Sequence, residues 1–198
     1  MNEVVNDKFK ISSKDVTAET FVTITITGTN DGPVAVADTA STDEDNGVTF
    51  AVLNNDSDPD TTDDLKVTQA TVLDDTDGVV SVDGNTNEIT FTPGSKYNAL
   101  AVNETATVIV TYTIEDNNGG SDNAEVTITI RGTNDIPTVS ADVIKTITED
   151  VDAQKVFGKV TITDHDDGEE TFAPTSNVQG DYGVFDVDAN GNWYYNLD

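Results

Sequence analysis

The sequence predicts an all-β fold of tandem antiparallel β-sandwiches that follow one another in a linear rod. Threonine and valine are abundant and strong helix formers are sparse, which favours strands over helices. Short alternating segments are separated by turn clusters at spacings of roughly 8–12 residues, which is typical of a β-sandwich. In addition, Gly-Thr-Asn-Asp-Gly-Pro at residues 28–33 returns as Gly-Thr-Asn-Asp-Ile-Pro at residues 132–137, 104 residues later. Because that period is one ordinary domain length, we expect an array of modules.

Residues 1–32 are expected to form the C-terminal hairpin of a preceding module. Strand patterns cover residues 9–12 and 21–27, with a polar turn between them. A single two-stranded hairpin is too small to bury a core of its own. We therefore expect the front half of this module to lie outside the given sequence.

Residues 33–134 are expected to form one complete sandwich. The alternation is clearest at the end of the module, where Val108, Val110, Tyr112 and Ile114 would share one face of a strand. A single helical turn is expected at residues 97–102. The expected strands are 34–37, 48–53, 65–72, 78–82, 88–92, 105–114 and 124–130.

Residues 135–198 are expected to form the N-terminal part of another sandwich. Strand patterns cover residues 143–147, 154–163, 183–188 and 192–197. No closing hairpin like that of residues 9–27 follows them, so we expect this module to be incomplete in the given sequence.

The charge of the chain excludes several classes of function. Thirty-eight acidic residues face nine basic ones, for a formal net charge of −29. Such a chain is repelled by nucleic acids and by anionic membrane surfaces. No apolar run approaches the roughly 18 residues that a membrane span needs, and the N-terminus does not begin a signal peptide. There is no cysteine, which excludes disulfides and thiolate sites.

The acidic residues gather in clusters that suggest a divalent cation. Asp56, Asp58 and Asp60 alternate just past an expected strand, and Asp164 and Asp166 do so in the last module. At a separation of about 4 Å and an effective dielectric constant near 20, two carboxylates repel by up to ~4 kcal/mol, and a bound cation reverses that repulsion. Ca²⁺ takes about six to eight oxygen ligands and tolerates irregular geometry. The alternative is a solvated acidic loop, since the spacing of an EF-hand is absent.

Other acidic residues recur at matching places in the modules. Glu44 and Glu149 precede the two clusters in similar acidic contexts, and a glutamate can chelate through both oxygens. Asp116 lies at a strand end before a glycine-containing turn, and Asp15 occupies the matching place in the first hairpin.

The order of these motifs resembles a known family. Glu, then Asp-x-Asp, then a late Asp, then Asn-Asp-x-Pro at the joint is similar to the cadherin-like extender modules of very large bacterial repeats-in-toxin (RTX) adhesins. Residues 138–198 resemble the VCBS repeat through residues 158–164, 180–185 and 188–195, and residues 3–31 resemble the tail of the same repeat. The resemblance implies cadherin-like, immunoglobulin-like Greek-key sandwiches with Ca²⁺ at the joints between them.

Carried over residue by residue, the resemblance implies two calcium sites. Three alternating acids at residues 56–60 leave open which pair chelates, and the glycine that follows the late Asp in the family is replaced by Val16. The first joint would use Asp15, Asn30, Asp31, Asp58, Asp60 and, as a further candidate, Asp56. The second would use Glu44, Asp116, Asn134, Asp135, Asp164 and Asp166, with Glu149 as an additional metal candidate.

The expected function is that of a calcium-rigidified extender in a secreted adhesin of a Gram-negative cell surface. There is no Ser/His/Asp set and no phosphate-binding glycine loop, so an enzyme is not expected, and His165 is interpreted as a solvated loop residue. Two alternatives are a carbohydrate- or protein-binding module, with Trp193 as the strongest ligand contact, and an accessory module of a secreted hydrolase. The expected partners are neighbouring modules of the same chain, with strand exchange between copies through the incomplete end modules, and neither nucleic acid nor membrane.

Overall fold

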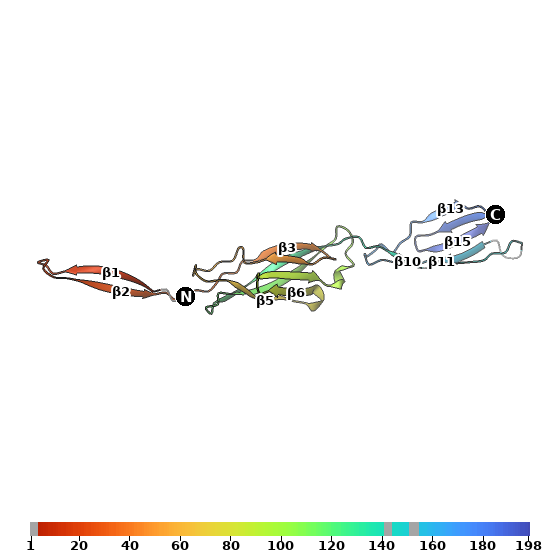
Figure 1. Cartoon of the computed structure of the whole chain (residues 1–198). Helices are drawn as coiled ribbons and strands as arrows, with labels where there is room; N and C mark the ends of the chain where they lie inside the picture. Colours follow the sequence, from red (N-terminus) through yellow and green to blue (C-terminus); the bar gives the residue numbers. More distant parts are fainter. Residues whose placement is uncertain (1–3, 141–143, 151–154) are drawn as a thin grey trace. The chain divides into compact units, whose positions relative to one another are not determined.

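A computed structural model describes residues 4–140, 144–150 and 155–198, and its regular elements are antiparallel strands with two short 3₁₀ turns (Figure 1). The expected all-β, antiparallel architecture is confirmed. None of the described helical segments is long or apolar enough to cross a bilayer. The chain divides into two compact units, one of residues 1–42, 46–94 and 107–129 and one of residues 43–45, 95–106 and 130–198.

The hairpin at the start of the chain is longer than expected. β1 (Val4–Ser12) pairs with β2 (Glu19–Thr27) over the whole of both strands. The prediction missed residues 4–8 and 19–20 because the polar run at residues 6–8 and the Glu-Thr at residues 19–20 break the apolar pattern. Since every residue of both strands is exposed, no buried face selects against those side chains. The pairing is supported by Lys10 Nζ, which lies 2.6 Å from Glu19 Oε1.

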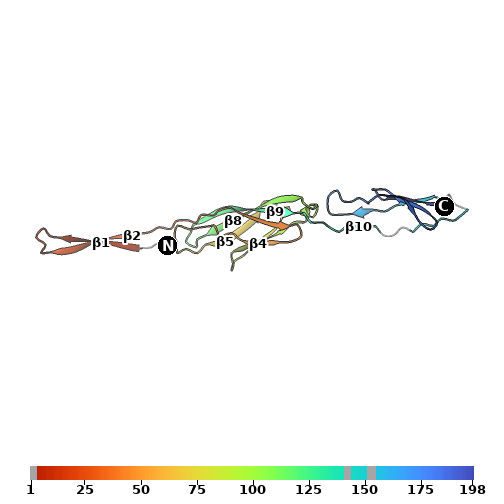
Figure 2. The ribbon, with the colours of Figure 1, turned by 90° about the horizontal axis from the view of Figure 1, so that it is seen from above.

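The complete sandwich consists of a four-stranded sheet and a three-stranded sheet. The strand orders are β3-β9-β8-β5 and β4-β7-β6, and β8 and β9 run beside each other in Figure 2. The bounds are β3 (Asp38–Asp43), β4 (Val48–Ala51), β5 (Lys66–Val72), β6 (Gly78–Asp83), β7 (Glu88–Pro93), β8 (Thr105–Glu115) and β9 (Ser121–Arg131). The 3₁₀ turns are η1 (Asp75–Asp77) and η2 (Ser95–Tyr97).

The core of this sandwich follows the alternation of its central strands. The expected inward residues of β8 are at most 1% exposed, as are Val126, Ile128 and Ile130 of β9. From the other sheet, Ile89 and Phe91 of β7 are fully buried. Two sheets with inward faces this well covered explain how the module folds without disulfides.

The sequence prediction was wrong for the segment that enters the sandwich. Residues 34–37 form only an isolated bridge, Val34 to Ser57, and β3 follows instead. The polar sequence of β3, Asp-Thr-Ala-Ser-Thr-Asp, gives no apolar alternation, and none of its residues is fully buried. The strand is at the edge of its sheet, where charged side chains are common. The helical turn expected at residues 97–102 is not found there, since the 3₁₀ turn η2 ends at Tyr97.

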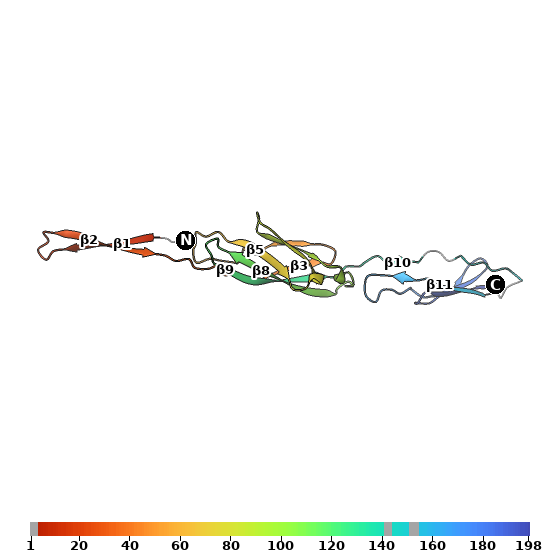
Figure 3. The ribbon, with the colours of Figure 1, turned by 90° about the horizontal axis from the view of Figure 1, so that it is seen from below.

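The last part of the chain forms a second four-stranded sheet, in the order β11-β15-β14-β13, and a small pair, β10-β12 (Figure 3). Strands β10 and β13 were missed because neither shows clear apolar alternation. Residues 144–147 are not in a strand, and residue 143 lies outside the described residues, as does residue 154. The bounds are β10 (Thr138–Val139), β11 (Lys155–Lys159), β12 (Ile162–Thr163), β13 (Thr175–Gln179), β14 (Gly183–Val187) and β15 (Asn192–Leu197).

Candidate metal centres

The first acidic cluster is built by the loop between β4 and β5. Asp58, Asp60 and Asp63 each place one carboxylate oxygen within 4.8 Å of the others, and all three are half-buried. The loop is held by the main-chain N–H of Asp60, which donates to Asp58 Oδ1 at 2.8 Å. Asp58 Oδ2 is buried and accepts no hydrogen bond from any described residue. This crowding of carboxylates favours a cation among them.

The linker that follows β2 is tied to this cluster. The N–H of Asp31 donates to Asp60 Oδ2 at 2.8 Å, and Asn30 Nδ2 donates to Asp116 Oδ2 at 2.7 Å. Asn118 Nδ2 also donates to Asp63 Oδ2 at 2.7 Å. Segments far apart in the sequence therefore meet at one place, which is named cluster 1 and consists of Asn30, Asp31, Asp58, Asp60, Asp63 and Asp116.

Asp116 belongs to cluster 1, so its expected grouping with Glu44 was wrong. The side chain of Asp116 is 1% exposed and accepts from the N–H groups of Asn118 and Gly120 at 2.7 and 2.9 Å. The hydrogen bond from Asn30 is the main reason that the pKa of Asp116 lies below its usual value. A Cβ at Gly120 would collide with Asp116 Oδ2 and would lie 2.7 Å from the Cα of Gly32, so only glycine allows this approach of the linker.

The second acidic cluster gathers around the linker that follows β9. Asp166 is fully buried and Glu44 is 5% exposed. The N–H of Thr133 donates to Glu44 Oε1 at 2.7 Å, and the N–H of Asp135 donates to Asp166 Oδ2 at 2.8 Å. The other oxygens, Glu44 Oε2 and Asp166 Oδ1, are buried and accept no hydrogen bond from any described residue. Cluster 2 consists of Glu44, Asn134, Asp135, Asp164 and Asp166.

The two clusters share the same set of contacts. In each, the linker Asp donates its N–H to the second Asp of an Asp-x-Asp pair at 2.8 Å. In each, that second Asp donates its own N–H to the first, at 2.8 Å from Asp60 to Asp58 and 3.3 Å from Asp166 to Asp164. The linker asparagines also bond alike, with Asn30 and Asn134 donating to the carbonyls of Asp31 and Asp135. The same arrangement of hydrogen bonds therefore occurs at both clusters.

The donor set of both clusters fits a hard divalent cation. Every side-chain ligand is a carboxylate or amide oxygen, which Ca²⁺ prefers. A buried carboxylate oxygen without a donor costs free energy that a bound cation removes. The clusters draw their oxygens from loops of irregular geometry, which suits Ca²⁺ better than Mg²⁺ because Mg²⁺ demands a near-ideal octahedron.

Two residues expected at the first joint lie elsewhere. Asp15 is in the turn at the far end of β2, and nine strand residues, about 30 Å, separate that turn from the linker. There the hydroxyl of Ser13 donates to Asp15 Oδ1 at 2.5 Å, and this bond lowers the pKa of Asp15. Its assignment to the first joint was therefore wrong.

Asp56 is the other residue that points away from cluster 1. Its Oδ1 accepts from the N–H of Val36 at 2.7 Å and lies 3.2 Å from the hydroxyl of Tyr112. Burial raises the pKa of Asp56 and of its neighbour Asp38, and it also raises that of Tyr112. Asp56 thus fastens the entering segment to the core, and Asp58 and Asp60 are the pair beside the linker.

Glu149 and His165 have no part in the contacts that define the clusters. Glu149 is exposed and lines a separate groove with Asp181, Tyr182 and Asp198. The side chain of His165 is 75% exposed and lies 3.8 Å from Asp135 Oδ2. Asp63 was missed by the sequence reasoning, although its place in the acidic loop that holds Asp58 and Asp60 was a usable signal.

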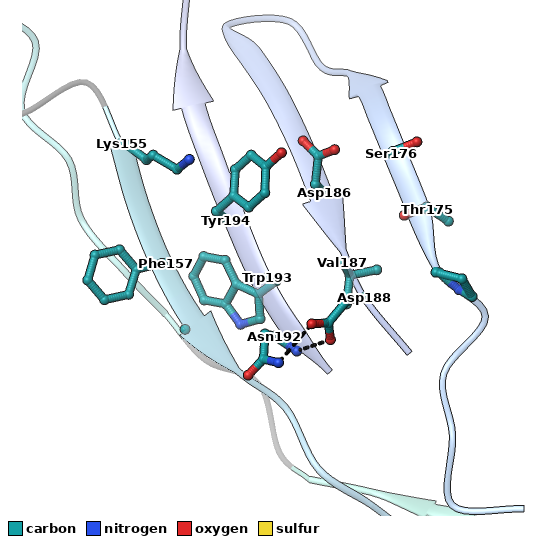
Figure 4. Close-up of a pocket in the computed structure, with 12 residues that line it drawn as sticks. Lys155, Phe157, Thr175, Ser176, Asp186, Val187, Asp188, Asn192, Trp193 and Tyr194 are labelled. Atoms are coloured by element: carbon teal, nitrogen blue, oxygen red, sulfur yellow. Dashed lines mark hydrogen bonds between the residues drawn. The ribbon is translucent and has the colours of Figure 1, made fainter. Parts of the chain in front are cut away.

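A different kind of site lies on one face of the C-terminal sheet. A groove of about 690 Å³ is lined by Phe157, Tyr194, Trp193 and Asp186, among others (Figure 4). Phe157 is 74% exposed, and Lys155 Nζ lies 3.8 Å from the centre of the Tyr194 ring. Burial, with the nearby carboxylate of Asp186, raises the pKa of Tyr194. At the edge of the groove, Asn192 Nδ2 donates to Asp188 Oδ2 at 2.8 Å, and the two bonds from Asn192 lower the pKa of Asp188.

Comparison with known families adds to this geometry. The model of the bacterial cadherin-like domain matches residues 30–132, which include all seven strands of the complete sandwich and the last four residues of the first linker. The chain belongs to the bacterial cadherin-like domain family. A cadherin-like domain is an adhesion-type module, and the family match indicates no enzyme family. Among curated proteins, none matches its sequence.

One solved structure supports the same fold, and a second is reported for comparison. Cadherin domains 1–5 of protocadherin gamma B2 align with a TM-score of 0.51 and 14% identity, covering 100% of this chain and 45% of that one. Domains 21–23 of human CDH23 align with a TM-score of 0.49 and 18% identity, covering 85% and 60% of the two chains. The cadherin-like chain thus spans less than half of the protocadherin structure, and the similarity concerns the fold alone.

Proposed function

We propose that this chain is a calcium-rigidified extender segment of a secreted bacterial surface adhesin of the RTX type, which holds a distal binding region away from the cell. The observation that carries this proposal is the duplicated site, because each Gly-Thr-Asn-Asp linker is bonded to an Asp-x-Asp pair that leaves buried carboxylate oxygens unsatisfied. A chain with a single function at one surface has no need of the same acidic arrangement at two successive linkers.

The proposed role of calcium is mechanical. Asp31 and Asp135 are already tied through their main chains to Asp60 and Asp166. An ion that takes oxygens from the linker and from the flanking loop adds further fixed bonds to each linker, so rotation about it costs more. The same ion offsets local repulsion in a chain of net charge −29. Weak sites suffice, since extracellular modules bind calcium at Kd values of about 10⁻⁴–10⁻³ M.

The proposed location is the outside of a Gram-negative cell. Support comes from the cadherin-like family, whose domains are extracellular, and from the resemblance of residues 3–31 and 138–198 to VCBS repeats. The absence of cysteine means that metal ions would take the stabilising role that disulfides have in many secreted proteins. The proposed partners within the assembly are neighbouring modules of the same chain.

Small-angle X-ray scattering tests the extender proposal. We expect a well-defined maximum dimension in millimolar Ca²⁺ and a broad, shorter distribution of distances in excess chelator, because the linkers then bend. Sodium chloride at matched ionic strength separates bridging by the ion from simple screening. A distance distribution that is the same in calcium and in chelator would contradict the proposal.

A second candidate function is carbohydrate binding, favoured by the groove in Figure 4. The exposed ring of Phe157 offers a stacking surface, and the exposed side chain of Lys155 lines the same groove, where its ammonium group can bind hydroxyl groups. This function would make the chain a ligand-binding module of an adhesin or an accessory module of a secreted hydrolase.

A glycan array read with three proteins tests this second function. We expect a bound glycan to lose at least about fivefold in affinity with Phe157→Ala, since stacking on an aromatic ring contributes on the order of 1 kcal/mol or more. Tyr182→Ala, which removes an aromatic ring that is 75% exposed outside this groove, is the matched control. An array on which the unsubstituted chain binds no glycan would remove carbohydrate from consideration.

A further inference from the structure

Two sheet faces in this chain are apolar and uncovered among the described residues. The first is one face of the β1-β2 hairpin, where the pairs Val5 with Ile26 and Phe9 with Val22 lie side by side. These four residues are 42–54% exposed, and no described strand other than its partner pairs with β1 or β2. Asp7, paired with Ile24, is the one charged residue on this face.

The second is one face of the C-terminal sheet. Register places Trp193 and Tyr195 of β15 on the same side as Phe185 and Val187 of β14. These residues line a groove of about 510 Å³ and are only half-buried. The Trp193 ring packs directly against β11, since a Cβ at Gly158 would lie 2.5 Å from it.

The complete sandwich shows what covers a sheet of this kind. Its three-stranded sheet, β4-β7-β6, has the same strand order as β11-β15-β14. The registers of the two sheets also agree. Ile89 and Phe91 of β7 pair with β6, and Trp193 and Tyr195 of β15 pair with β14 in the same way. The two sets of residues are 104 positions apart in the sequence. In the sandwich, Ile89 and Phe91 are fully buried, and the opposite sheet contains β8 and β9.

The hairpin is the counterpart of β8 and β9. Val22, Ile24 and Ile26 precede Val126, Ile128 and Ile130 by the same 104 residues. The second set is fully buried in the sandwich, whereas the first is 42–54% exposed. The hairpin therefore matches the strands that pack over a three-stranded sheet in the complete sandwich. The C-terminal sheet matches the three-stranded sheet on which those strands pack.

Electrostatic repulsion does not oppose packing of the hairpin against the C-terminal part of another copy. Residues 4–27 contain three lysines and three acidic residues, so the hairpin is neutral in a chain of net charge −29. It is the segment that can approach the acidic C-terminal part of another copy with little repulsion.

We infer that the β1-β2 hairpin of one copy packs on the Trp193–Tyr195 face of the C-terminal sheet of a second copy, completing a sandwich between molecules. A second copy is favoured over the same chain because both linkers are short and are bonded in place. Residues 28–33 are held by Asp60 and Asp116, and residues 132–137 are held by Asp166, so neither linker has the slack that a fold-back of the hairpin within one chain needs. Head-to-tail contacts of this type produce chains or closed rings of copies.

A mixing experiment tests the inference. With calcium in excess, light scattering behind size exclusion should show a mass of the unsubstituted chain that rises with concentration. Ile24→Asp spoils only the hairpin face, and Tyr195→Asp spoils only the sheet face, so each variant alone should be monomeric. An equimolar mixture should form a one-to-one dimer, because one intact hairpin then meets one intact sheet. The control is Thr23→Asp, which places the same charge on the opposite face of the hairpin and should associate like the parent.

Several outcomes would overturn the inference. The first is a parent chain that stays monomeric at every concentration. The second is a Tyr195→Asp variant that still dimerises alone, as hairpin-to-hairpin contact would predict. The third is a mixture that stays monomeric although both variants keep the circular dichroism of the parent. Because the chain has no cysteine, a disulfide trap gives an independent result. Oxidising a mixture of Ile24→Cys and Tyr195→Cys should yield the mixed dimer in excess over either homodimer. An intrachain disulfide in the dilute double variant would instead assign the contact to a single chain.

Discussion

Calcium at millimolar concentration should raise the thermal unfolding temperature of the chain by about 10–20 °C relative to excess chelator. At about 1 mM Ca²⁺ a site with a Kd of about 10⁻⁴ M has ligand at about ten times its Kd and stabilises the folded state by about 1.4 kcal/mol, so two such sites contribute about 2.8 kcal/mol. Each kcal/mol shifts the Tm of a domain of ~100 residues by about 4–8 °C. Both clusters border the complete sandwich, through Asp58 and Asp60 at one linker and Glu44 at the other. Differential scanning calorimetry in the two buffers measures the shift.

Ionic strength requires a control, since any salt screens repulsion in so acidic a chain. Sodium chloride at matched ionic strength should produce only a small part of the shift, and Mg²⁺ should produce less than Ca²⁺. Equal melting temperatures in calcium and in sodium chloride would mean that screening, and not a bound ion, stabilises the fold.

Replacing one buried carboxylate should change stability in opposite directions with and without calcium. Asp166→Asn removes the charge of a fully buried side chain whose Oδ1 accepts no hydrogen bond from the described residues. In chelator this variant should melt at or above the temperature of the parent, because repulsion with its neighbours is relieved. In calcium it should melt below the parent and should lose at least about tenfold in affinity at cluster 2, since an amide is a weaker ligand than a carboxylate.

Asp60→Asn is the matched change in cluster 1, and Asp75→Asn removes one charge from an exposed turn as a control. Titration calorimetry should show that Asp60→Asn and Asp166→Asn each remove a different class of calcium site while leaving the other, and that Asp75→Asn leaves both. A variant that melts below the parent by the same amount in both buffers would indicate a purely structural role for Asp166.

The parts of the fold predicted correctly are those where burial imposes a strict pattern. Val108, Val110, Tyr112 and Ile114 alternate in the sequence because one face of β8 is fully buried. The polar edge strand β3 and the exposed ends of the β1-β2 hairpin have no such constraint, so neither could be read from alternation. Where no face is buried, strand pairing leaves little trace in the side chains.

The candidate sites were predicted in part for a similar reason. Repetition identified the linkers and the acidic clusters at residues 56–60 and 164–166, because their spacing along the chain is fixed, but it left open which of the three acids at 56–60 lie beside the linker. The grouping of more distant residues was wrong where it depended on which end of a strand they occupy. Asp116 lies at the opposite end of the sandwich strands from the expected joint, as its bond from Asn30 in the first linker shows. Asp56 belongs to the same alternating series as Asp58, but the N–H of Val36 and the hydroxyl of Tyr112 draw it toward the core.

A crystal structure grown in ample Ca²⁺, with anomalous scattering to locate the ions, tests the central claim most directly. We predict an ion in cluster 1 and another in cluster 2, each with about six to eight oxygens at about 2.3–2.6 Å. The ligands at cluster 2 would include Asp166 Oδ1 and Glu44 Oε2, the buried oxygens that the protein itself leaves unsatisfied. Ordered water without anomalous signal at both clusters would contradict the claim that calcium holds the modules of this chain together.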